Sequence, residues 1–289
     1  MSDGTSTSPV TRFAPSPTGY LHLGHAFAAL FAFQAAQRKD GRFFLRIEDI
    51  DRGRCRTEFE DAILEDLAWL GLSWAKPVRR QFEHFDDYAK ALDTLDQQGL
   101  LYPCFCTRKD IRDEIVQSGQ APHVGPEGPV YPGTCRALSM NEREQRIGQG
   151  DSYALRLDMA KACDHTGALT WMDQKQNKPI PATPEIFGDV ILARKDTPTS
   201  YHLACTLDDH LQGITLVTRG EDLLTATHVH RLLQSLLGLD TPAYHHHGLI
   251  TGETGERLSK RDQAQTLRSL REAGTSPEDV QKLAGFEDI

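Results

Sequence analysis

The sequence predicts an α/β protein built around a parallel sheet. Residues 10–14 have the pattern of a buried strand, and they run through a Pro/Gly turn into an apolar helix at residues 26–36. A second strand at residues 42–47 precedes a helix that begins at Thr57, with acidic side chains in its first turn. Strands that alternate with helices in this way are typical of a parallel sheet covered by helices.

The middle of the chain interrupts this alternation. Its loops are rich in Pro and Gly and carry a cluster of cysteines, which predicts an inserted domain. The α/β pattern then resumes, with strands at residues 190–192 and 214–218 and a helix at residues 225–237. We therefore predict four segments: the first half of the core (residues 1–102), the inserted domain (103–189), the second half of the core (190–247) and a short helical C-terminal stub (248–289).

Composition excludes several classes of protein. The chain has 289 residues, 39% of them hydrophobic and 25% charged, which is enough to bury a substantial core. Its net charge of −9 means that any contact with nucleic acid must come from local basic patches. No apolar run approaches the ~18 residues of a membrane helix, and the polar first nine residues contain no signal-peptide core. We expect a monomeric cytoplasmic protein that makes no contact with a membrane.

The run from Arg12 to Ala26 reads Arg-Phe-Ala-Pro-Ser-Pro-Thr-Gly-Tyr-Leu-His-Leu-Gly-His-Ala. It predicts a strand, a loop and a helix start that carries two histidines three residues apart. The free N–H groups and partial positive charge of a helix N-terminus suit a phosphate. Both His22 and His25 can point at that phosphate from one face, and Gly24 lets a nucleotide approach the backbone. The alternative is a helix cap with two surface histidines.

This run resembles the HIGH signature of the class I aminoacyl-tRNA synthetases, in the form found in the glutamyl/glutaminyl subgroup. An acidic strand end at residues 45–51 and a Lys/Arg-rich loop at residues 257–261 follow in the family's order. Residues 201–210 and 217–222, which lie between them, are similar to segments of the same enzymes. The resemblance implies a Rossmann-like nucleotide-binding core that holds an inserted zinc-binding domain of the acceptor type.

The resemblance also implies the reaction. In this family an amino-acid carboxylate attacks the α-phosphate of ATP, which is bound with Mg²⁺, and catalysis is mostly positioning and electrostatics. The catalytic residues implied are His22, His25 and Lys260. The implied ATP-binding residues are those three together with Gly24, Arg257 and Ser259. The family's KMSKS loop usually begins with Lys, whereas here Arg257 keeps the charge but changes its shape.

A glutamate pocket can be argued by matching charges. Glutamate has one ammonium and two carboxylates, so a selective site needs one acidic residue and two cationic ones. The resemblance places Glu48 at the amino group and Arg12 and Arg219 around the carboxylates, without deciding which arginine takes which carboxylate. The other implied glutamate-binding residues are Phe13, Ala14, Pro15, Ser16 and Tyr201. Cys205 stands where ordinary glutamyl-tRNA synthetases tend to have Asn, which predicts a weaker or differently shaped site.

Cys104, Cys106 and Cys135 have the spacing of three ligands of a tetrahedral zinc ion. The alternative is a set of reduced structural cysteines. Chemistry alone favours His123 as the fourth ligand, whereas the resemblance to shortened glutamyl-synthetase paralogues points to Tyr131. We expect one structural zinc ion, because a small Pro/Gly-rich insert has little core of its own.

The large helical domain that reads the anticodon in full glutamyl-tRNA synthetases does not follow residue 261. A compact chain of this length has a radius of gyration of about 19 Å, too small to hold both far ends of a tRNA. The architecture is similar to the shortened paralogues that attach glutamate to queuosine in the tRNA(Asp) anticodon loop. It implies ATP, L-glutamate and queuosine-containing tRNA(Asp) as substrates, with glutamate activated before tRNA binds. The alternatives are a minimal glutamyl-tRNA synthetase that charges a 3′ end and a non-enzymatic paralogue that binds nucleotide or RNA.

Overall fold

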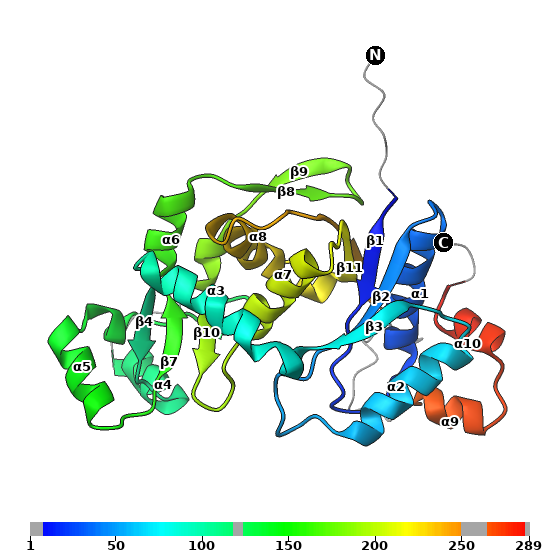
Figure 1. Cartoon of the computed structure of the whole chain (residues 1–289), viewed down its shortest axis with the longest axis horizontal. Helices are drawn as coiled ribbons and strands as arrows, with labels where there is room; N and C mark the ends of the chain where they lie inside the picture. The colour runs from blue at the N-terminus through cyan, green and yellow to red at the C-terminus, as the bar shows by residue number, and fades with distance from the viewer. Residues whose placement is uncertain (1–7, 118–123, 250–264, 287–289) are drawn as a thin grey trace, which may run out of the picture.

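The N-terminal part of the chain forms the parallel sheet that its sequence predicts. In the computed structural model, which describes residues 8–117, 124–249 and 265–286, three strands pair in parallel in the order β1-β2-β3 (Figure 1). The elements are β1 (Val10–Phe13), α1 (Leu23–Gln37), β2 (Arg42–Ile47), α2 (Thr57–Trp69) and β3 (Ala75–Arg80). Buried alanines at positions 26, 29, 32 and 36 let α1 lie close to β1 and β2. Gly41 is required at the turn before β2, because a Cβ there would lie 2.0 Å from the Pro9 carbonyl oxygen.

A second sheet continues the core beside β1. Strands β11 (Leu216–Gly220) and β12 (Ala243–His247) pair in parallel, and the Thr215 N–H donates to the Val10 carbonyl at 3.0 Å. Helices α7 (Tyr201–Leu211) and α8 (Ala226–Leu236) pack against each other next to this sheet. These elements confirm the predicted return of the α/β pattern after the middle of the chain.

The middle of the chain shares its strands with the core. Strands β4 (Leu101–Cys104), β7 (Ala154–Leu157) and β10 (Ile191–Arg194) form an antiparallel sheet, while β8 (Thr170–Asp173) and β9 (Lys178–Pro181) extend the sheet of β11 and β12. The remaining elements are α3 (Phe85–Gln97), α4 (Arg108–Gln117), β5 (Val124–Gly125), β6 (Gly128–Pro129), α5 (Met140–Gly148) and α6 (Met159–Thr166). Two strand pairings therefore cross the boundary predicted between residues 189 and 190, and the division into domains stays a prediction.

The short C-terminal helices pack against α1 and α2. Leu267 and Leu270 of α9 (Leu267–Glu272) and Val280 of α10 (Pro277–Leu283) are buried in the same apolar cluster as α1 and α2 (Figure 1). The sequence predicted helical structure in this segment, and α9 and α10 confirm it for residues 267–283. Across the described ranges, none of the helices has the length and apolar character needed to cross a membrane.

Helix α7 lies at the centre of the molecule and is buried on almost every side (Figure 1). Its residues 202–209 are all buried, and several of them are polar or charged. Because a buried polar group without a partner costs free energy, these side chains need hydrogen-bond partners from other elements. Asp208 accepts from Arg79 Nε at 2.7 Å, Gln81 Nε2 at 2.9 Å and the Tyr88 hydroxyl at 2.9 Å. Helix α7 is therefore a rigid platform for the residues at its N-terminal end.

Candidate active site

The two histidines predicted at the phosphate lie at the start of α1. His22 is the N-cap, and its Nδ1 accepts from the Gly24 N–H at 3.1 Å. His25 Nδ1 accepts from the His22 N–H at 3.2 Å, which closes a reciprocal capping box. The ring centroids lie 3.9 Å apart. The structure confirms the helix cap and brings both imidazoles to one place, while their role at a phosphate stays a prediction.

The predicted Lys/Arg-rich loop lies outside the described residues. Arg257, Ser259 and Lys260 therefore have no described position. The chain returns to the histidines directly after this segment, since Thr266 forms a β-bridge with His22 and the Leu267 N–H donates to the Leu21 carbonyl at 2.8 Å. This return places the downstream anchor of the loop beside the N-terminus of α1.

The strand end after β1 is tied to the acidic strand end after β2. The Glu48 N–H donates to the Pro15 carbonyl at 2.9 Å. The Phe13 side chain is buried in the apolar core, so its backbone is the part that faces the loop. Ala14 is half-buried, and Ser16 is exposed. The predicted pocket residues of this loop therefore lie next to Glu48, with Ser16 offering its hydroxyl at the surface.

A buried network neutralises Arg12. Its Nε donates to Asp209 Oδ1 at 2.9 Å, and Arg46 Nη1 donates to the same oxygen at 2.8 Å. Arg46 Nη2 also donates to Glu48 Oε1 at 3.1 Å. Burial acts to raise the pKa of Asp209, but the two arginines outweigh it and hold that pKa below its usual range. Arg12 and Arg46 therefore already have carboxylate partners within the core, so we infer that the first role of Arg12 is structural.

Cys205 lies inside this network. Its Sγ is 3.8 Å from Arg12 Nη2 and 3.6 Å from Arg46 Nη2. Burial raises the pKa of this thiol to about 12, so the side chain is neutral and a weak hydrogen-bond partner. Sequence reasoning gave no role to Arg46 or Asp209, although both lie in the segments that carry the family resemblance.

Arg219 has a different environment. It is buried on β11, and its hydrogen-bond partners in the described ranges are all uncharged. They are the Tyr201 hydroxyl at 3.3 Å, His230 Nδ1 at 3.2 Å, Thr227 Oγ1 at 2.7 Å and His246 Nε2 at 3.3 Å. Burial, together with Arg219, lowers the pKa of His246 to about 3 and that of His230 well below its usual value.

Within the described part of the chain, the charge of Arg219 therefore has no counter-charge. Among the described residues, no carboxylate forms an ion pair with its guanidinium. A buried charge without a counter-charge is costly, and a ligand carboxylate would supply the missing negative charge. The hydroxyl of Tyr201, the other predicted glutamate-binding residue in this part of the molecule, accepts from Arg219 and can donate to a ligand beside it. The two side chains together can bind one carboxylate.

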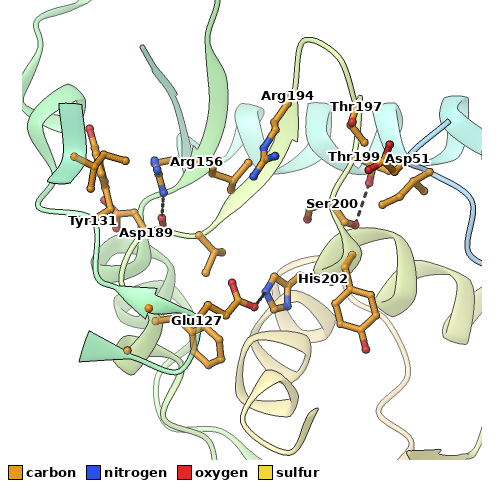
Figure 2. A pocket seen from close by; sticks show the side chains of 18 of the residues that line it. Asp51, Glu127, Tyr131, Arg156, Asp189, Arg194, Thr197, Thr199, Ser200 and His202 are labelled. Carbon is orange, nitrogen blue, oxygen red and sulfur yellow. Dashed lines mark hydrogen bonds and ion pairs between the residues drawn. The ribbon is translucent and has the colours of Figure 1, made fainter. Parts of the chain in front are cut away.

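A cavity of about 410 Å³ lies beside Tyr201 (Figure 2). It lies between the N-terminal end of α7, the loop before it and the region that carries the cysteines. Its polar lining includes Asp51, Glu127, Arg156, Asp189, Arg194 and His202. Its size is that of a small-molecule pocket. None of these lining residues was predicted as part of a site, because they come from segments that are far apart in the sequence.

The three predicted cysteine ligands come together. Their sulfur atoms all lie within 4.8 Å of one another, and Cys106 Sγ is 3.4 Å from Cys135 Sγ. A tetrahedral zinc with bonds of about 2.3 Å places neighbouring sulfurs about 3.8 Å apart, which lies inside this range. The Tyr131 hydroxyl lies 3.5 Å from Cys106 Sγ and accepts from the Cys135 N–H at 2.8 Å. The other predicted candidate, His123, lies outside the described residues.

The β1–α1 cap, the acidic strand end and the buried arginines define the nucleotide-binding core of an aminoacyl-tRNA synthetase, and the comparison with known families agrees. The model of the tRNA synthetases class I (E and Q), catalytic domain, matches residues 9–284. The chain belongs to this family. The predicted resemblance to the glutamyl/glutaminyl subgroup is therefore confirmed.

Individual relatives refine this assignment. The chain is 48% identical to the glutamyl-Q tRNA(Asp) synthetase of Rhodobacter capsulatus over 96% of its own length and 100% of that protein. It is 39% identical to the glutamate–tRNA ligase of Hydrogenobaculum sp., but it covers only 56% of that enzyme. Among solved structures, the glutamate-tRNA synthetase from Elizabethkingia anophelis superposes with a TM-score of 0.75 at 30% identity, and 53% of that chain is covered. The chain therefore spans about half the length of the glutamate–tRNA ligases that it matches.

Proposed function

We propose that this protein activates L-glutamate with ATP and Mg²⁺ and transfers it to queuosine in the anticodon loop of tRNA(Asp). One observation carries the proposal. The glutamyl-Q tRNA(Asp) synthetase of Rhodobacter capsulatus is matched over its whole length at 48% identity, whereas the glutamate–tRNA ligases are matched over little more than half of theirs. A minimal glutamyl-tRNA synthetase that charges a 3′ end is the less favoured alternative.

We propose that Arg219 and Tyr201 bind the side-chain carboxylate of glutamate. The α-carboxylate must reach the ATP phosphate near His22 and His25 in order to react. Arg219 is surrounded by residues of α7, α8 and β12, and within the described ranges its side chain forms no hydrogen bond with the loop that precedes α1. Glutamine would leave the buried guanidinium without a counter-charge, which favours glutamate strongly.

Glu48 is the proposed partner of the glutamate ammonium group. Its carboxylate is half-buried and already accepts from Arg46, and burial raises its pKa although Arg46 opposes that shift. An incoming ammonium would favour the ionised carboxylate. Arg12 supports Glu48 indirectly, because Arg12 and Arg46 share Asp209 and Arg46 contacts Glu48. Arg12 forms the floor of the site, together with the backbone of residues 13–16.

The remaining roles concern ATP. We propose that His22 and His25, fixed by the capping box, stabilise charge on the phosphoryl oxygens, and that Gly24 allows the close approach of the nucleotide. Lys260 acts at the pyrophosphate end, with Arg257 and Ser259 in support. These assignments rest on the motifs, because residues 250–264 lie outside the described part of the chain. The chemical step then depends on positioning and charge rather than on a covalent intermediate.

We propose that Cys104, Cys106, Cys135 and Tyr131 hold one structural zinc ion in an inserted domain of the acceptor type. The donor set fits, because three thiols and a phenol converge within ordinary ligand spacing. The Arg156 guanidinium lies 4.0 Å from the Tyr131 ring centroid, but burial raises the pKa of this phenol, so the charge of the metal ion itself would have to favour the phenolate. Zinc would cross-link β4 to the following loop and supply no chemistry to the reaction. The expected monomeric state and cytoplasmic location stay predictions.

Glutamate-dependent exchange of pyrophosphate into ATP tests the first half of the proposal. Exchange should proceed in the absence of tRNA, with L-glutamate strongly preferred over L-glutamine. Exchange that requires tRNA would favour the minimal-synthetase alternative. A purified, folded protein without exchange under either condition would indicate a paralogue that only binds its ligands.

A further inference from the structure

We propose that Glu127 and His202 are positioning residues for glutamate, acting through His230 on Arg219. The inference rests on the proposed function, and it adds two residues to which nothing in the family motifs assigns a role. Glu127 lies on the β5–β6 hairpin, in the region that carries the cysteines, whereas Arg219 lies on β11 of the core. The inference therefore connects two parts of the molecule that are distant in the sequence.

Chemistry fixes which atom donates in each hydrogen bond that links Arg219 to Glu127. A guanidinium can only donate, so His230 Nδ1, at 3.2 Å from Arg219 Nη1, must accept. A neutral imidazole that accepts at Nδ1 carries its proton on Nε2, which then donates to His202 Nδ1 at 3.3 Å. His202 in turn carries its proton on Nε2 and donates to Glu127 Oε1 at 3.0 Å. Figure 2 shows the last of these bonds at the edge of the cavity.

The Glu127 carboxylate, at the far end of this series of hydrogen bonds, determines the tautomers of His202 and His230. Without the Glu127 carboxylate, the His202 ring could carry its proton on either nitrogen. A proton on Nδ1 of His202 would remove the acceptor of the His230 Nε2–H group. Burial and Arg219 both lower the pKa of His230, which agrees with a neutral ring. Glu127 therefore fixes His202, His202 fixes His230, and His230 presents a lone pair that holds the guanidinium in position.

The simpler interpretation is an ordinary surface pair between an acid and a histidine. Exposed pairs of this kind contribute little to stability. Here, however, the His202 side chain is only 7% exposed, and its second nitrogen is already committed to another buried ring. Glu127 is 64% exposed and lies at the rim of the cavity. The chain of bonds therefore runs from the cavity rim to the guanidinium that we assign to glutamate.

A spectroscopic test examines the tautomers of His202 and His230 independently of activity. Nitrogen-15 NMR of histidine-labelled protein, with signals assigned from His202→Asn and His230→Asn variants, reports the tautomer of each ring. We expect both rings in the wild-type protein to be neutral and protonated on Nε2. Glu127→Ala should change the His202 signal and, through it, the His230 signal, whereas Val124→Ala on the same hairpin should change neither. A proton on Nδ1 of either ring in the wild-type protein would overturn the proposal.

A kinetic test addresses positioning. In pyrophosphate exchange, Glu127→Ala should raise the KM for glutamate about 5- to 10-fold and leave the KM for ATP within about 2-fold, because a distant hydrogen-bonded group is lost. Glu127→Gln keeps an acceptor oxygen and should retain most of the wild-type affinity. The Val124→Ala control should behave as wild type.

The outcomes separate this inference from the proposed function. A wild-type protein that shows no exchange refutes the function but leaves the tautomers to be read by NMR. An active wild-type protein with an unchanged glutamate KM in Glu127→Ala refutes the positioning role. An equal rise in the KM for glutamate and for ATP, accompanied by a fall in Tm, would indicate general damage to the fold and would also count against it.

Discussion

Replacing Arg219 with methionine should separate binding from stability. The guanidinium is buried and forms hydrogen bonds with four neutral side chains. Its removal has two opposing effects: a desolvated charge is eliminated, and those hydrogen bonds are lost. Replacing a whole buried ion pair with apolar side chains of similar volume is often neutral for folding, and replacing Arg219 leaves no unpaired carboxylate among the described residues. We therefore expect the free energy of unfolding of Arg219→Met to change by no more than about 1 kcal/mol.

Arg12→Met is the matched comparison. Arg12 shares Asp209 with Arg46, so its removal leaves a buried carboxylate with half of its positive charge. Breaking a buried pair in this way typically costs about 3–5 kcal/mol of stability. The two arginines are equally buried, but they should differ clearly in urea unfolding measurements at neutral pH.

Glutamate binding should depend strongly on Arg219, although the stability of the fold does not. Loss of one partner of a buried charge pair costs about 2–5 kcal/mol of binding, which raises the Kd of Arg219→Met for glutamate about 30- to 4,000-fold. Calorimetry measures this Kd, and ATP binding serves as the internal control. Arg219→Lys keeps the charge without the planar fork and should fall between. If Arg219→Met unfolds as easily as Arg12→Met and binds glutamate normally, the assignment is wrong.

Three further predictions concern pH, metal and the loop. Burial raises the pKa of Asp66 to about 6 although Arg271 opposes it, so the folded state holds a proton that the unfolded chain releases near pH 4. Stability is then lost between about pH 4 and 6, by up to about 3 kcal/mol, and Asp66→Asn should raise Tm at pH 8 but not at pH 4. An equal gain at both values would refute this. Purified protein should contain close to one zinc per chain, and Cys104→Ser should lower both zinc content and Tm; metal-free wild type never exposed to chelator would count against it. Lys260→Ala should slow exchange by about 2–4 kcal/mol of activation free energy, and an unchanged rate would remove Lys260 from the site.

Local features of the site were predictable from the sequence. The strand-loop-helix around His22, the second strand before Glu48 and the convergence of the cysteines each depend on residues that are close together or on a spacing with a known geometry. The structure confirms all three. Helix caps and ligand spacings are local physics, and a sequence records them directly.

The long-range pairings were not predictable in the same way. Arg46 and Asp209 are 163 positions apart, and periodicity indicates that both are buried without indicating that they meet. The same holds for Glu127 and His202, which are 75 positions apart. Strand β10 pairs with β7, which in turn pairs with β4, rather than with the parallel strands, because a short apolar strand has no preference for one sheet. Such contacts are decided by the tertiary fold.

The most direct test of the central claim identifies the nucleoside that receives glutamate. Queuosine-containing tRNA(Asp) without its 3′ terminal adenosine is incubated with the protein, ATP and labelled L-glutamate, then digested to nucleosides and analysed by mass spectrometry. We predict that the label is found on queuosine, and that tRNA(Asp) lacking queuosine stays unlabelled. Label that requires the 3′ terminal adenosine, or that appears on queuosine-free tRNA(Glu), would contradict the account.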